Sequence, residues 1–160
     1  MVQGPPPATP VMRLKIRLLL PLLALPFAAS AQNVPLNCPE LPAGIADANW
    51  EEIRGDDFLY CKAIRDNGAQ ALGVMLREKP QFKERSRLRE DKAVIDGHKV
   101  RWYRGDITSS SGELVRETLV ELHDDVSAHI VVRASTEEKL EERLRLAEAL
   151  HFPDFVATRD

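Results

Sequence analysis

Histidine and acidic side chains are the residues of this sequence best suited to chemistry. The chain has four histidines: His98, His123, His129 and His151. None of them stands in H-E-x-x-H or another metal-binding spacing. The best grouping that the pattern predicts places His123 and His129 close together across a β-hairpin, with Glu121 and Asp124 nearby. Such a group can bind a metal ion or relay a proton. A solvated polar strand face explains the same residues without a site, and we prefer that interpretation.

No recognisable catalytic or cofactor motif occurs in the chain. The serines of Thr108–Glu113 lack the G-x-S-x-G context of a nucleophile elbow, and there is no P-loop or dinucleotide-binding fingerprint. Asp56-Asp57 and Asp124-Asp125 stand where turns are expected, so they are interpreted first as turn formers. We therefore expect no catalytic, cofactor-binding or metal-binding residue.

The two cysteines, Cys38 and Cys61, are expected to form a disulfide. Two thiols in a small exported chain usually pair because the compartment is oxidising. Lipid modification of Cys38 is disfavoured because Asn37 precedes it where a small residue is expected. A metal site needs more soft ligands than two cysteines and scattered histidines.

The N-terminal 31 residues are interpreted as an extension followed by a cleaved signal peptide, Met12–Ala31. Basic residues precede an apolar run that ends in Ala29-Ser30-Ala31, which is the pattern of export signals. The apolar run Leu18–Ala29 is too short for a transmembrane anchor. We expect translation to start at Met12, cleavage after Ala31, and a mature domain of residues 32–160 that is periplasmic or secreted.

Charge argues against a nucleic-acid partner. The whole chain has 22 Lys and Arg against 25 Asp and Glu, and cleavage removes three basic residues and no acid. The mature net charge is therefore about −6, whereas phosphate binding needs a net basic face. The most charged segment, Lys79–Asp91, can be interpreted as an anion-binding strip or as a solvated connection. Its interspersed acids favour the second interpretation.

In the N-terminal half, the pattern predicts a short helix followed by a hairpin. The helix is expected at Asp47–Arg54, with Trp50 in the core. Strands at Phe58–Ile64 and Ala71–Glu78 are joined by Asn67-Gly68, which favours a two-residue type I′ turn. That turn predicts three apolar cross-strand pairs: Ala63 with Leu72, Cys61 with Val74, and Leu59 with Leu76.

Two further hairpins and a helix are expected downstream. Ala93–Ile107 forms a hairpin with Asp96-Gly97 as its turn and Trp102 in the core. Leu114–Phe152 is expected to form strand, turn, strand and helix. Apolar parity requires a connection of odd length between its strands, either the three residues 124–126 or five residues.

The three-residue version pairs Glu121 with His129 and Glu117 with Arg133 on the solvent side. These pairs define a candidate polar surface: Glu117, Glu121, His123, His129 and Arg133. The helix is expected to begin with a capping box, in which Ser135 is the N-cap and Glu138 bonds back to it.

These elements predict a single α+β domain. We expect an antiparallel sheet of about five strands in meander-like hairpins, packed on one face by a C-terminal helix and preceded by a short N-terminal helix. The expected function is a small exported, non-enzymatic binding protein of inhibitor or immunity type. Its partner would be an envelope protein or small ligand, and no cofactor is expected. The alternative is a small metal-dependent or hydrolytic enzyme that uses His123, His129 and Glu121.

Overall fold

A computed structural model describes residues 36–42, 47–105, 112–123 and 125–153, together with Met1 and Gly4. The expected signal peptide Met12–Ala31 lies outside the described residues, as does most of the Thr108–Glu113 loop. The chain divides into two units, Met1–Gln32 and Asn33–Asp160, and every element below belongs to the second unit.

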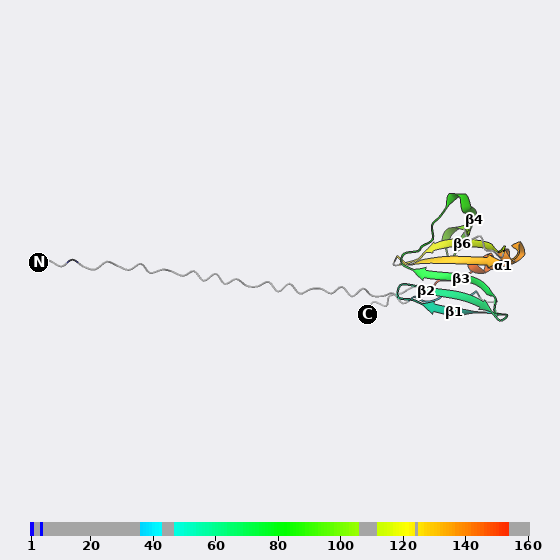
Figure 1. Ribbon diagram of the computed structural model, residues 1–160, viewed down its shortest axis with the longest axis horizontal. Helices are drawn as coiled ribbons and strands as arrows, with labels where there is room; N and C mark the ends of the chain where they lie inside the picture. The colour runs from blue at the N-terminus through cyan, green and yellow to red at the C-terminus, as the bar shows by residue number, and fades with distance from the viewer. Residues whose placement is uncertain (2–3, 5–35, 43–46, 106–111, 124, 154–160) are drawn as a thin grey trace. The chain divides into compact units, whose positions relative to one another are not determined.

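The second unit is an antiparallel sheet packed by one C-terminal helix, so the expected α+β architecture is confirmed. The sheet has seven strands rather than about five, in the order β1-β2-β3-β7-β6-β5-β4 (Figure 1). The strands are β1 (Ala48–Arg54), β2 (Leu59–Arg65), β3 (Gln70–Arg77), β4 (Arg89–Ile95), β5 (His98–Arg104), β6 (Leu114–Glu121) and β7 (Ser127–Ala134). A 3-10 turn, η1 (Ser86–Leu88), precedes β4, and the helix is α1 (Glu137–Glu148).

The hydrophobic core lies between the sheet and α1. The helix packs mainly on β7, with further contacts to β3 and β4. On the sheet side the core is built from alternate positions of the strands, as a sheet with one covered face requires. Its fully buried members include Leu59, Cys61, Leu72, Val74, Leu76, Ile95, Trp102, Val120, Ile130 and Val132. The predicted core position of Trp102 is therefore confirmed.

The expected N-terminal helix is absent, and its residues form β1, an edge strand. β1 pairs with β2 along its whole length, with Trp50 opposite Ala63. The three-residue spacing of Trp50 and Ile53 suggested a helical face, but the strand places them on opposite faces. Trp50 is half-buried against the core, whereas Ile53 is 43% exposed. Pairing with a neighbouring strand outweighs the weak helical preference of so short a segment.

The hairpin between β2 and β3 has the three predicted apolar pairs but a different turn. Gly68 has a φ of 79°, whereas Asn67 does not have positive φ, so the predicted type I′ turn is wrong. The loop holds three residues, closed by a hydrogen bond from Gly68 N–H to the Arg65 carbonyl at 2.8 Å. Ala71 is then an extra residue in β3, and this bulge restores the predicted register from Ala63 onward.

The hairpin between β4 and β5 matches its prediction. Ile95 pairs directly with His98, which leaves Asp96 and Gly97 as a two-residue loop. Both have positive φ, 48° and 80°, as a type I′ turn demands.

The hairpin between β6 and β7 confirms the odd parity of its connection but not the three-residue register. Glu121 lies opposite Ser127, which is the five-residue version. The predicted pairing of Glu121 with His129 is therefore wrong, because His129 lies opposite Leu119. The predicted pairing of Glu117 with Arg133 is wrong for the same reason. A shift of two residues keeps every side chain on its predicted face.

The start of α1 lies one residue later than predicted. Thr136, not Ser135, is the N-cap, and its hydroxyl oxygen accepts from the Lys139 N–H at 3.3 Å. Threonine and serine cap helices by the same bond, so sequence alone separates adjacent candidates poorly. The reciprocal bond predicted for Glu138 does not apply in this register, since Lys139 occupies the N3 position.

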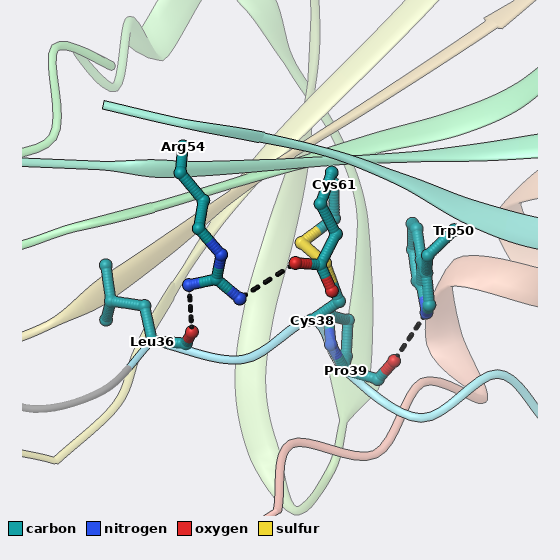
Figure 2. Close-up of a disulfide and its surroundings, with 7 residues drawn as sticks. Leu36, Cys38, Pro39, Trp50, Arg54 and Cys61 are labelled. Carbon is teal, nitrogen blue, oxygen red and sulfur yellow. Dashed lines mark hydrogen bonds and ion pairs between the residues drawn. A yellow bond between two sulfur atoms is a disulfide. The ribbon is translucent and has the colours of Figure 1, made fainter.

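The predicted disulfide between Cys38 and Cys61 is present, with Cα atoms 5.8 Å apart. It joins the irregular segment 36–42 to the core side of β2. Figure 2 shows two further attachments of this segment: the Trp50 indole donates to the Pro39 carbonyl at 2.6 Å, and Arg54 donates to the Leu36 carbonyl at 2.9 Å. The segment and α1 thus cover the same face of the sheet.

Candidate functional site

The face of the sheet opposite α1 carries most of the polar residues that the sequence analysis selected. We call it the helix-free face. Its positions alternate along each strand with those of the core. They are Tyr60, Lys62, Met75, Lys99, Arg101, Tyr103, Glu117, Leu119, Glu121, Ser127, His129, Val131 and Arg133.

A histidine–carboxylate pair lies near the middle of the helix-free face. His129 Nε2 and Glu117 Oε2 are 3.1 Å apart, although the two residues are diagonal neighbours on β7 and β6 rather than directly opposite. Their side chains are about equally sheltered, at 22% and 20% exposure. Diagonal positions lie within reach of long side chains. The pair can hold or pass a proton.

The connection between β3 and β4 folds over this pair. The Phe82 ring stacks on the His129 ring, with centroids 4.9 Å apart and planes inclined by 26°. Phe82 also meets Tyr103 edge-on, with centroids 5.5 Å apart. A cavity of about 290 Å³ lies beside Phe82, His129 and Glu117. Phe82 thus helps to attach the charged segment to the sheet.

Tyr103 links the same connection to β5. Burial raises the pKa of the Tyr103 phenol, and a hydrogen bond to Glu84, together with the negative charge of that carboxylate, raises it further. Arg89 also bonds the phenol and acts in the opposite direction. The Tyr103 phenol therefore remains protonated. Its hydroxyl bonds with both the Glu84 carboxylate and the Arg89 guanidinium.

The other predicted surface residues are dispersed. Glu121 is exposed near the end of β6, and the half-buried Arg133 lies opposite Val115 on β6. His123 lines a separate cavity of about 190 Å³ with Asp96 and His151. The structure therefore brings together Glu117 and His129 but does not gather His123, His129 and Glu121 into one site.

The cavity at His123 is organised by Asp96 of the β4–β5 turn. Asp96 accepts hydrogen bonds from His151 Nδ1 at 2.8 Å and from the Phe152 N–H at 2.9 Å. Burial alone would raise the pKa of Asp96, but these bonds, with the nearby His98, outweigh burial and lower it. This arrangement joins the end of the α1 segment to the turn.

An open cleft of about 1040 Å³ lies beside Tyr103. It lies between the β4–β5 hairpin, the outer end of β6 and the connection that precedes β4. Its charged lining residues are Arg89, Lys92, Lys99 and Arg101, with Glu84 and Glu121. We call it the basic cleft.

The described residues contain neither a metal-binding cluster nor a membrane-spanning helix. In the ranges that the structure describes, no three His, Cys, Asp or Glu side chains lie close enough to hold a metal ion. Among those same residues, none of the helices has the length and apolar character needed to cross a membrane.

Comparison with known proteins gives no assignment. No family model, curated protein or solved structure matches this chain.

The sequence analysis did not predict that Phe82 stacks on His129, nor did it predict the basic cleft. Phe82 was the one large aromatic residue in a highly charged segment, and that contrast was a usable signal. Lys92 and Lys99 gave no such signal, because each is an ordinary charged residue of an amphipathic strand. Only the fold brings them beside Arg89 and Arg101.

Proposed function

We propose that the mature chain is a small exported protein that binds another protein through the helix-free face of its sheet. A narrower version is an inhibitor or immunity-type protein that acts on an envelope enzyme. The observation that carries the proposal is the contrast between the two faces. One is covered by α1 and the segment 36–42, and the other presents half-buried polar and aromatic groups beside an open cleft.

The composition of this face supports a protein partner. It combines the half-buried Phe82 and Arg101 and half-buried apolar positions such as Val131 with a charged rim. Aromatic and arginine side chains are enriched in the centres of protein interfaces, and charged groups surround them. The disulfide supports export, since such bonds persist in oxidising compartments.

A site-specific photocrosslinking experiment tests the proposal. A photoreactive phenylalanine analogue replaces Val131 on the helix-free face, and a matched control replaces Glu141, which is exposed on α1. After expression from the full-length gene, cells are fractionated and irradiated. We expect the mature protein in the envelope fraction and a discrete crosslinked species from position 131 only. Retention in the cytoplasm would contradict the export proposal. Crosslinks at neither position, or at position 141 alone, would contradict binding through this face.

A further inference from the structure

The basic cleft opens where β5 separates from β6. The ladder between these strands has only two residue pairs, whereas the ladder between β6 and β7 has eight. Between His98 and Trp102, β5 has ladder partners on β4 alone in the described sheet. The Thr118 hydroxyl donates to the Arg101 carbonyl at 2.9 Å, which replaces one of the missing ladder contacts. A gap along an extended strand is a natural place for another extended segment.

Positive charge is concentrated and partly uncompensated in this gap. Lys92 and Lys99 are exposed, and no ion pair joins either of them to an acid among the described residues. At the other end of the sheet, Lys62, Arg65 and Arg77 each pair with a carboxylate. The chain as a whole is acidic, so this local excess of positive charge is unusual for it. Complementary charge selects partners and accelerates their encounter.

The remaining lining residues narrow the class of ligand. Glu84 and Glu121 also line the cleft, so its charge is mixed and suits a ligand with spaced negative charges better than a dense polyanion such as polyphosphate. Val94 is 56% exposed beside the cleft, and Leu119 contributes a second apolar side chain. A ligand that carries carboxylates together with apolar side chains satisfies both features.

We infer that the basic cleft binds an extended acidic segment of the partner protein. The segment lies along β5, its carboxylates pair with Lys92 and Lys99, and its apolar side chains contact Val94 and Leu119. This inference rests on the proposed function and adds the chemical class of the partner's contact segment.

The test uses a fluorescein-labelled peptide of about ten residues, long enough to span β5, in which Glu alternates with Val. A peptide with Lys in place of Glu is the charge control. Fluorescence anisotropy is measured with the mature, disulfide-bonded protein. We expect binding of the Glu peptide that weakens as salt is raised, and none of the Lys peptide. Binding of inorganic polyphosphate and of phosphatidylglycerol vesicles is measured in parallel, to test a polyanion and a membrane surface as alternative ligands.

Single charge reversals locate the site. We expect Lys92→Glu and Lys99→Glu each to weaken binding at least about tenfold. Lys139→Glu, the same change on the exposed start of α1, should leave binding unchanged. Circular dichroism and the unfolding midpoint verify folding, and neutral Lys99→Gln should show a smaller loss in the same direction.

Three results would overturn the inference: no binding of the Glu peptide by the wild type, equal loss in Lys139→Glu, or binding of polyphosphate or vesicles in place of the peptide. None of these three results by itself contradicts the proposed function, which the crosslinking experiment tests separately. If crosslinking at position 131 persists in the envelope while the peptide does not bind, the face is still an interface and only the acidic-segment assignment is wrong.

Discussion

Reduction of the Cys38–Cys61 disulfide should destabilise the domain by a calculable amount. The cysteines are 23 residues apart, and loop closure of that size contributes about 3.4 kcal/mol to stability at 25 °C in the chain-entropy model. Reduction removes no side-chain atoms, so it leaves no cavity where the disulfide was. The Cys61 thiol remains a small apolar group in the core, where the residue is fully buried. The link itself is therefore isolated from any cavity effect.

Urea unfolding with and without a phosphine reductant measures this difference. With a denaturant slope of about 2 kcal/mol per M, the midpoint should fall by about 1.7 M. Trp50 and Trp102 report through fluorescence from the edge and the core, and far-ultraviolet circular dichroism tests whether the transition is two-state. A reduced protein within about 1 kcal/mol of the oxidised one would refute the reasoning. It would mean that the hydrogen bonds of segment 36–42 already hold it in place.

Three further predictions test individual contacts. Glu148→Leu should destabilise the domain by about 1–3 kcal/mol, because the buried Trp102 indole loses the acceptor that lies 3.0 Å from its nitrogen. Glu148→Gln keeps an acceptor oxygen and should destabilise less, and urea unfolding compares the two variants. Asp96→Asn should remove a pH dependence. The bond to His151 lowers the folded pKa of Asp96, so the unfolded state binds more protons and wild-type stability falls as pH drops below about 4. The variant's stability should fall less over the same range, and the part that remains includes Glu142, whose pKa is lowered by Arg65. Gly105→Ala should destabilise by about 1–3 kcal/mol, because the added Cβ meets a β6 valine at 2.5 Å; thermal melting measures it, and an unchanged midpoint would show that β6 yields freely.

Much of the strand architecture could be predicted from local chemistry. The apolar alternation around Asn67-Gly68 predicted the pairs of β2 with β3, and Asp96-Gly97 predicted its turn. These signals work because a tight turn and a buried face both restrict the backbone locally. The misassignment of residues 47–54 shows the limit. An edge strand with one covered side and few apolar residues has no distinctive hydrophobic periodicity. Its pairing with β2 depends on tertiary contacts, which a local pattern does not encode.

The candidate site was less predictable than the fold. Composition and alternation correctly placed Glu117 and His129 on one polar face. They could not predict that Phe82 would stack on His129, because the path of an irregular connection depends on tertiary contacts. The basic cleft depends on the divergence of β5 from β6, which no local pattern encodes.

In the β6–β7 hairpin, the sheet face that a side chain occupies and the residue that lies opposite it on the next strand are determined by different features of the sequence. Hydrophobic alternation determines only whether the connection has an odd or even number of residues, because every shift by two residues keeps the same side chains buried. The choice between registers must then come from the turn and from polar contacts. Here the shift of two residues replaces the pairs of Glu117 with Arg133 and Glu121 with His129 by a diagonal contact between Glu117 and His129 at 3.1 Å. It also leaves Glu121 exposed near the end of β6, beside the basic cleft. The register, and not the alternation, therefore decides which polar residues a partner meets on the helix-free face.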